Sequence, residues 1–295
     1  DAGFAAEAAP TTTAPAVGEY RHMQADKPTS LVAALLLGCI GVFAIMAGPI
    51  ITEALVAALG IEPGVAGQII AVEALGTALG PVAAAFWMPR VKWRTAAIVA
   101  ILVVITGNVI SGSITSASSL AVLRFAVGFF GEGPAFALAI AIISGTTQKD
   151  RNFAFLIAAQ VVLGVLCFLL LPIPKDAGVS GVLLPLAGLA LVTLFTVGWI
   201  PQPDGAAGHH ATSSQAGASA LPAFIALAVM LIWCTGLGAI WFFIKLIGTS
   251  AGIDSTQVGV ALGVSTGVAT LGALAAAGLA DRIGRIIPVT VALLV

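Results

Sequence analysis

The stretch that decides the fold of this chain is Asp281-Arg282-Ile283-Gly284-Arg285, a short charged segment near its C-terminal end. It lies between two long apolar stretches, and 59% of all residues are hydrophobic whereas only 8% are charged. A soluble core of this size cannot cover so much apolar surface, but a lipid bilayer can. The composition therefore predicts a membrane protein, and the charged segment is predicted to be a loop between two membrane helices.

Apolar runs of roughly 20 residues, the length that an α-helix needs to cross a bilayer, recur along the chain. They predict an all-α polytopic membrane protein in which a ninth helix begins near residue 286. The other eight helices are expected at about 31–57, 66–88, 95–115, 120–145, 153–172, 179–199, 221–248 and 256–280. The Gly48-Pro49 pair is expected to bend the first helix near its outer end.

Polar segments divide the chain into four parts. Residues 1–30 are rich in Pro, Ala and Thr and are expected to form a disordered cytoplasmic tail. Residues 31–200 contain six predicted helices, and residues 220–295 contain helices seven to nine. Between them, residues 201–219 have the Ser/Gly/Ala-rich composition of a flexible linker.

An internal repeat supports this division. The loop at residues 89–94, which contains Arg90 and Arg94, follows the second helix of its half, as the charged segment at residues 281–286 does. The two loops lie at the same distance from the starts of helices one and seven, within a residue or two. Two related six-helix halves are a common transporter architecture. Since the chain stops in its ninth helix, we expect the sequence to be truncated at its C-terminal end.

The basic residues predict the orientation. If successive helices alternate in direction, nine Lys and Arg residues fall on one side, and only Lys175 lies clearly in a loop on the other. Loops rich in Lys and Arg remain in the cytoplasm. We therefore expect a multi-pass protein of the cell membrane whose N-terminus and Asp281–Arg285 segment are cytoplasmic.

Residues 277–286 read Ala-Gly-Leu-Ala-Asp-Arg-Ile-Gly-Arg-Ile, which resembles the G-x-L-A-D-R-x-G-R-[RK] loop of the major facilitator superfamily of secondary transporters. Ala277 replaces the opening glycine and Ile286 the last basic residue. The resemblance implies two pseudo-symmetric six-helix halves and alternating access. It also implies that the loop stabilises the outward-open state, through Asp281, Arg282, Gly284 and Arg285.

Ionisable side chains inside membrane helices cost a few kcal/mol each, which favours a functional role. Glu73 lies in the second predicted helix, Arg124 and Glu132 in the fourth, and Lys245 near the outer end of the seventh. The stretch beginning at Arg124 resembles the R-x-x-x-G-x-G stretch of the superfamily. That resemblance implies proton coupling by Arg124, and the alternative is a structural arginine paired with a carboxylate or with backbone carbonyls.

Ideal helical geometry relates these residues to each other. At 100° per residue, Gly128 and Gly131 fall within about 40° of Arg124, and Glu132 lies about 80° from it. The glycines are expected to give Arg124 a smooth face against a neighbouring helix, and Glu132 to line a cavity. A buried carboxyl group without a close cation can bind and release a proton near neutral pH. Glu132 or Glu73 is therefore a candidate proton carrier, or else a neutral acid hydrogen-bonded to an adjacent helix.

Other side chains are weaker candidates. Lys245 is expected to extend to the outer surface, with contact to an anionic solute as the alternative. Thr235 and Trp241 lie on the seventh helix, which lines the central path in this superfamily, although an aromatic residue at a helix end is often an interface anchor. Asn108 and Gln160 are polar residues within other helices.

The sequence thus predicts transmembrane transport of a small organic solute, with protons as a candidate coupling ion. An enzyme is disfavoured because neither H-E-x-x-H nor G-x-S-x-G occurs, and a non-transporting membrane sensor on the same fold is the alternative. The net charge of −1 gives no reason to expect a nucleic-acid partner. Three scattered cysteines suit neither a disulfide framework nor a zinc site. We expect a monomer without cofactor or metal.

Overall fold

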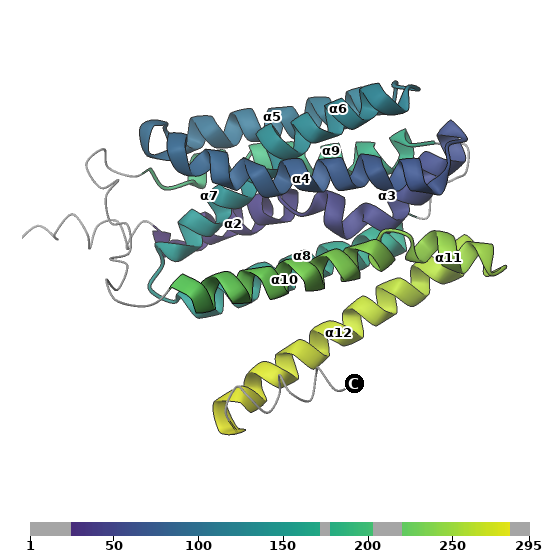
Figure 1. The fold of residues 1–295 in the computed structure, drawn as a ribbon. Coiled ribbons are helices and arrows are strands. Elements are labelled where there is room, and N and C mark those ends of the chain that lie inside the picture. The colour runs from purple at the N-terminus through teal and green to yellow at the C-terminus, as the bar shows by residue number, and fades with distance from the viewer. Residues whose placement is uncertain (1–24, 172–177, 203–219, 284–295) are drawn as a thin grey trace, which may run out of the picture.

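The computed structural model describes residues 25–171, 178–202 and 220–283, and the regular elements among these residues are all helical (Figure 1). The longer helices are α2 (Pro28–Ile40), α3 (Phe43–Leu59), α4 (Pro63–Trp87), α5 (Trp93–Ser111), α6 (Ala117–Val127), α7 (Gly133–Ser144), α8 (Lys149–Leu170), α9 (Ser180–Leu194), α10 (Ala220–Trp241), α11 (Ile244–Ser250) and α12 (Ser255–Ile283). The short segments are η1 (Met88–Arg90), the π-helical η2 (Gly128–Glu132) and η4 (Val197–Trp199).

The eight helices that the apolar runs predict within the described residues are present, and two of them are interrupted. The first is broken between α2 and α3 at Gly41 and Val42, and the seventh between α10 and α11. Pro49 lies inside α3, so the predicted bend at Gly48-Pro49 falls within a continuous helix and stays a prediction. The break in the helix comes earlier, at Gly41, where a side chain would collide with Phe136 of α7.

Six helical segments among the described residues are long and apolar enough to cross a membrane. They are Pro28–Leu59, Pro63–Arg90, Trp93–Ser111, Ala117–Ser144, Lys149–Leu170 and Leu231–Ser250. Apolar side chains also cover their outer surfaces; Phe86, Leu170 and Ile232 are 71%, 73% and 74% exposed. Such a surface is stable against lipid and not against water.

The helices from α2 to α9 pack into one bundle. Within it α4 packs against α6, α5 against α9 and α2 against α7, around a core of buried apolar residues such as Leu37, Ile101 and Leu138. Two of the remaining helices contact this bundle directly. Helix α12 packs along α8, and α11 contacts α3. Figure 1 shows α12 crossing the lower side of the molecule.

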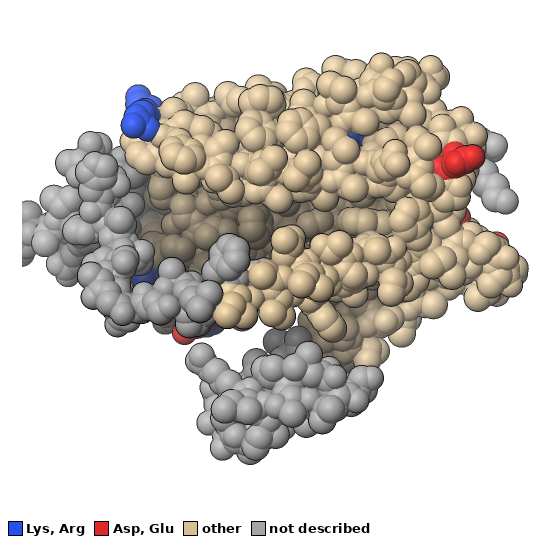
Figure 2. All heavy atoms as spheres, in the orientation of Figure 1, with Lys and Arg blue, Asp and Glu red and all other residues tan. Residues whose placement is uncertain are grey.

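The two ends of the bundle differ. Helices α2, α5 and α8 begin at the end where α4 finishes, which we call the Arg94 end (Figure 1). The opposite end contains α11, and we call it the Lys245 end. Toward the Arg94 end the molecule is hollowed between the bundle and α10 (Figure 2). Figure 2 also shows Lys and Arg side chains at the Arg94 end.

Several sequence predictions concern residues that the structure does not describe. The backbone of Asp281 and Arg282 belongs to the last turn of α12, but their side chains, like Gly284 and Arg285 altogether, lie outside the described residues. The same holds for most of the predicted tail and linker and for the ninth helix. The role of the charged segment therefore stays a prediction.

Candidate functional site

Three helices bring an ion pair into the interior of the bundle. Arg124 of α6 forms a salt bridge with Glu73 of α4, and its Nη1 donates a hydrogen bond of 2.6 Å to Oδ1 of Asn108 on α5. These three side chains are only 3%, 0% and 1% exposed, respectively. The arginine that the sequence singled out is thus paired with one of the two predicted acids, and Asn108, a weaker candidate, is its second partner.

Glu132 belongs to the same cluster. The hydroxyl group of Thr77 on α4 donates a hydrogen bond of 2.8 Å to Oε2 of Glu132, and the carboxyl groups of Glu132 and Glu73 are within hydrogen-bonding reach of each other. Glu132 is 1% exposed, so the expectation that it lines a cavity is wrong. We call the group formed by Glu73, Thr77, Asn108, Arg124 and Glu132 the carboxyl cluster.

The π-helical turn of η2 explains how Glu132 reaches the cluster. The amide of Gly133 donates to the carbonyl of Gly128, five residues earlier, so this turn holds one more residue than an α-helical turn. The extra residue turns everything after it back by about 100° relative to an ideal α-helix. Glu132 is the last residue of this turn, so it is rotated from its ideal position about 80° away toward the face of Arg124. The ideal geometry assumed for the sequence was wrong here.

Glycines allow α4 and η2 to approach closely enough for these contacts. A Cβ atom at Gly128 would collide with the carbonyl oxygen of Glu73, and one at Gly133 would lie 2.8 Å from the Cα atom of Gly80. The prediction that Gly128 gives Arg124 a smooth packing face is consistent with this contact. Gly131 behaves differently, because its open side faces Val104 of α5.

Gly128→Ala tests this packing. The added methyl group must displace α4, and overpacking of this kind costs about 1–3 kcal/mol. We therefore expect a lower midpoint of thermal unfolding for the purified protein in detergent. Gly188→Ala is the matched control, because a Cβ atom at Gly188 of α9 meets nothing within 4 Å. An unchanged midpoint for Gly128→Ala would show that the interface is looser than the structure indicates.

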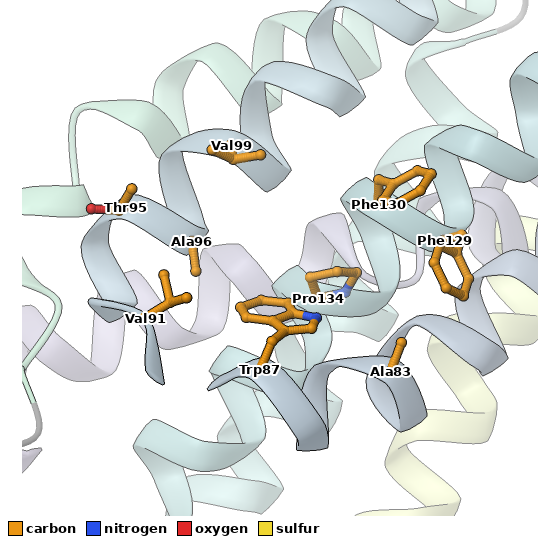
Figure 3. Close-up of a pocket in the computed structure, with 9 residues that line it drawn as sticks. All are labelled: Ala83, Trp87, Val91, Thr95, Ala96, Val99, Phe129, Phe130 and Pro134. Carbon is orange, nitrogen blue, oxygen red and sulfur yellow. The ribbon is translucent and has the colours of Figure 1, made fainter. Parts of the chain in front are cut away.

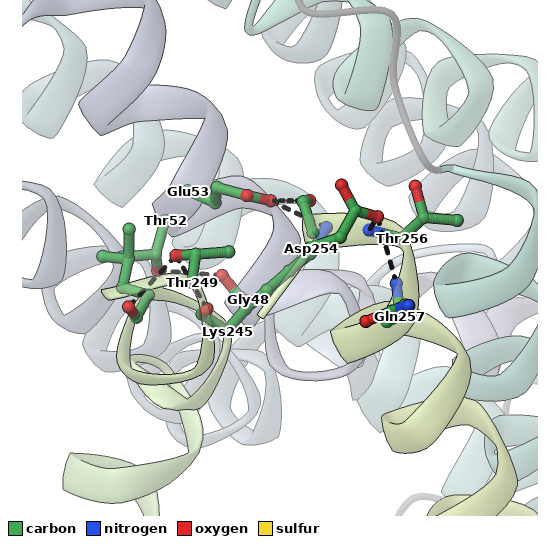
Figure 4. Close-up of polar contacts among 10 residues, drawn as sticks. Gly48, Thr52, Glu53, Lys245, Thr249, Asp254, Thr256 and Gln257 are labelled. Atoms are coloured by element: carbon green, nitrogen blue, oxygen red, sulfur yellow. Dashed lines mark hydrogen bonds and ion pairs between the residues drawn. The ribbon is translucent and has the colours of Figure 1, made fainter. Parts of the chain in front are cut away.

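A second group of polar contacts lies at the Lys245 end (Figure 4). Nζ of Lys245 on α11 lies 2.7 Å from Oε2 of Glu53 on α3, and the hydroxyl of Ser255 on α12 donates to the same oxygen at 3.2 Å. Lys245 is 3% exposed, so it does not extend to the outer surface as expected. The carboxylate of Glu53 gives the ammonium group of Lys245 an anionic partner within the protein, and this pairing was not predicted from the sequence.

Aromatic residues at the break between α10 and α11 add further contacts with α3 at this end of the bundle. The indole nitrogen of Trp241 donates a hydrogen bond of 2.8 Å to the carbonyl oxygen of Ile45. In a regular helix that carbonyl would accept from the amide of residue 49, which is a proline and has no N–H. Trp241 therefore supplies the donor that Pro49 lacks. Beside it, the ring of Phe242 covers the α-carbon of Gly48.

A third aromatic residue contacts another helix of the bundle. The ring of Phe243 packs against Gly67 near the start of α4, at a distance that leaves no room for a side chain there. We call the contacts of Trp241, Phe242, Phe243 and Lys245 with α3 and α4 the closing contacts. They join the part of the chain after residue 220 to the bundle that precedes it.

The other predicted residues do not join either group. Thr235 is exposed on α10, and its hydroxyl donates to the carbonyl of Leu231 in the same helix. The guanidinium of Arg90 donates to the carbonyl of Phe86, and Nε of Arg94 donates to the carbonyl of Ile200 at 2.9 Å. These two arginines therefore hold loops at the Arg94 end.

A groove of about 340 Å³ lies between α4, α5 and the π-helical turn (Figure 3). Its lining is almost wholly apolar, and it contains none of the ionisable residues described above. The residues that line it are Ala83, Trp87, Val91, Thr95, Ala96, Val99, Phe129, Phe130 and Pro134. A groove of this chemistry suits hydrocarbon, and the polar side-chain groups of its lining are the hydroxyl of Thr95 and the indole nitrogen of Trp87.

Comparisons with known proteins support the fold. A sequence profile of the Major Facilitator Superfamily matches residues 31–295. Among solved structures, the fold is similar to one described as the crystal structure of a D-xylose-proton symporter, with a TM-score of 0.63 and 11% sequence identity over 86% of this chain and 69% of that chain. At this identity the likeness shows the fold alone. No curated protein matches the sequence.

Proposed function

Because this chain belongs to the major facilitator superfamily, we propose that it carries a small organic solute across the cell membrane by alternating access, with protons as the coupling ion. Membership of the family makes the protein a multi-pass secondary transporter. The solute class, the coupling ion and the orientation in the membrane are the parts that we propose.

The closing contacts are the observation that carries this proposal. They join α10 and α11 to α3 and α4 at the Lys245 end, whereas the space between α10 and the bundle is hollowed toward the opposite end. A solute path that is closed at one end and open at the other is one of the two states that alternating access requires. The second state needs the closing contacts to break.

The chemistry of the closing contacts is suited to repeated breaking. The bond from Trp241 to Ile45 joins neutral groups, and a bond of that kind contributes about 0.5–1.5 kcal/mol. Glu53 is 24% exposed, so water can replace Lys245 as its partner when the contact opens. The energy that separates the two states is then small enough for solute and ion binding to shift the balance.

The orientation rests on the distribution of charge. Lys and Arg side chains lie at the Arg94 end (Figure 2), and such loops stay in the cytoplasm. The Lys245 end is then the outer end, the N-terminus is cytoplasmic, and the structure represents the inward-open state. The Asp281–Arg285 segment would stabilise the opposite, outward-open state from the cytoplasmic side.

Transport into proteoliposomes tests the proposal. The purified full chain would be reconstituted with a pH-sensitive dye inside, and D-xylose, other monosaccharides and small carboxylates would be added outside in turn. We expect one of these solutes to change the internal pH and to accumulate when an inward proton gradient is imposed. A protonophore should abolish the accumulation.

Empty liposomes are the first control, and protein-containing liposomes without an imposed gradient are the second. If the solute equilibrates across the membrane without accumulating, the protein is a carrier that protons do not drive. If no member of the panel enters, although the reconstituted protein keeps its unfolding transition, transport of these solute classes is contradicted and a sensor role becomes the better reading.

A further inference from the structure

The carboxyl cluster holds two acidic groups and one cation within three packed helices. With Glu73 and Glu132 both ionised, the cluster would carry a net negative charge, because Arg124 alone cannot balance two carboxylates. Burying an unbalanced charge costs far more free energy than burying a balanced pair. One proton bound to either carboxyl group makes the cluster neutral.

We infer that Glu73 and Glu132 form a single proton-binding site, in which the two carboxyl groups share one proton beside Arg124. Its role in coupling rests on the proposed transport function, but proton binding itself does not. The site would exist as one unit, so neither residue alone would be the carrier. The sequence treated the two acids as alternatives, whereas the structure brings them together.

Two carboxyl oxygens without partners are available to the shared proton. Oε2 of Glu73 and Oε1 of Glu132 are buried and accept no other hydrogen bond. Two carboxylate oxygens cannot bond to each other, because neither has a hydrogen atom to donate. A proton between the carboxyl groups gives one of them a donor, and so provides a hydrogen bond that both ionised groups would lack.

Spare donors in the cluster fit the deprotonated state. Nε of Arg124 and Nδ2 of Asn108 are also buried without an acceptor. When the proton leaves, the second carboxylate needs hydrogen-bond donors. These two nitrogens belong to Arg124, which is paired with Glu73, and to Asn108, which is bonded to Arg124. The cluster therefore has groups for both protonation states, which a purely structural ion pair does not need.

Among the described residues, the surroundings contribute no other charge to the cluster. The charged groups that act on the two carboxyl groups are each other and Arg124, within the part of the chain that the structure describes. From α5 the cluster is faced by Asn108, which is neutral. Around Arg124, the side chains from α3, α6 and α9 are apolar, including Leu55, Leu120 and Leu183. Among the described residues, proton binding is thus governed by the three ionisable members.

Infrared difference spectroscopy tests the shared site on the purified full chain in lipid nanodiscs. A protonated carboxyl group has a carbonyl stretching band that an ionised one lacks, so the band from a buried acid can be followed as pH rises. Wild-type protein should show one such band that disappears at alkaline pH. Glu73→Gln and Glu132→Gln should each abolish it, because the remaining acid is balanced by Arg124 and stays ionised.

Glu53→Gln is the matched control and should leave the band unchanged, since Glu53 is paired with Lys245 at the other group of contacts. Arg124→Gln should enlarge the band to about twice its area, because without the cation both acids are protonated. The midpoint of thermal unfolding of each variant shows that it is folded. If one of the two glutamate variants does not fold, the other glutamate variant and Arg124→Gln still test the shared site.

Persistence of the band in Glu73→Gln would overturn the inference, because Glu132 would then hold its proton alone. A band that responds to sodium ions at constant pH would overturn it in favour of a metal-cation site. These readouts need no solute. If transport is not detected but the shared band is intact, the proposed function is refuted and the proton site is not. If transport is detected but the shared band is absent, the proton site is refuted and the proposed function is not.

Discussion

Arg124→Ala is expected to abolish transport and to lower the stability of the protein by about 3–5 kcal/mol, because it removes one partner of a buried ion pair. Glu73 is 0% exposed, so water cannot replace the guanidinium that it loses. Asn108 loses its donor in the same substitution. Thermal unfolding in detergent and proton-driven uptake in liposomes measure the two effects.

Two further variants separate charge from geometry. Arg124→Lys keeps the positive charge but lacks the planar fork that contacts Glu73 and Asn108 together, so we expect an intermediate loss of stability. Adding Glu73→Gln to Arg124→Ala should recover part of the stability, because the uncompensated charge is removed, but it should not recover transport. If Arg124→Ala is as stable as wild-type protein, the ion pair is not buried as the structure shows.

Trp241→Phe combined with Lys245→Gln is expected to open the Lys245 end. The two substitutions remove one neutral hydrogen bond and one bond to a charged group, worth about 1 kcal/mol and about 2 kcal/mol, respectively. Each 1.4 kcal/mol changes an equilibrium tenfold, so the open state should become about 100 times more populated. Thr52 is 0% exposed beside Glu53, and Thr52→Cys in a chain with its three native cysteines replaced by serine reports the opening.

In intact cells, an impermeant thiol reagent should label Thr52→Cys slowly when the closing contacts are present and much faster in the double variant. Trp233→Phe is the matched control, because Trp233 is 59% exposed on α10 and has no part in the closing contacts. Equal labelling with and without Trp241 and Lys245 would show that these residues do not close the path. If the label enters only after the cells are made permeable, the proposed orientation is wrong.

The sequence predicted the fold well because its signals are local. Long apolar runs can be counted, and the Asp281–Arg285 segment indicated the superfamily, which the match over residues 31–295 confirms. Helix breaks were less predictable. The proline at residue 49 predicts a bend, but neither the break at Gly41 nor the tertiary contact by which Trp241 satisfies the Ile45 carbonyl has a local signal in the sequence.

The rule that buried charges indicate function identified three of the five members of the carboxyl cluster. It could not show that Glu73, Arg124 and Glu132 belong together, because the angle between the last two depends on a π-helical turn that an ideal helix does not contain. Thr77 carries no sequence signal of its own. Glu53 did carry one, as an acid within an apolar run.

The hydrogen bond from the Trp241 indole to the Ile45 carbonyl of α3 affects how the protein is assembled during synthesis. The Ile45 carbonyl has its donor 196 residues later in the chain, so the first helices leave the ribosome with this group unsatisfied. Ile45 lies near the middle of the membrane span Pro28–Leu59, so its carbonyl lacks this donor until α10 is inserted. We therefore expect the bundle of α2 to α9 to lack one of its hydrogen bonds until α10 has been synthesised. The two parts of the nascent protein are then joined when the Trp241 indole docks against α3.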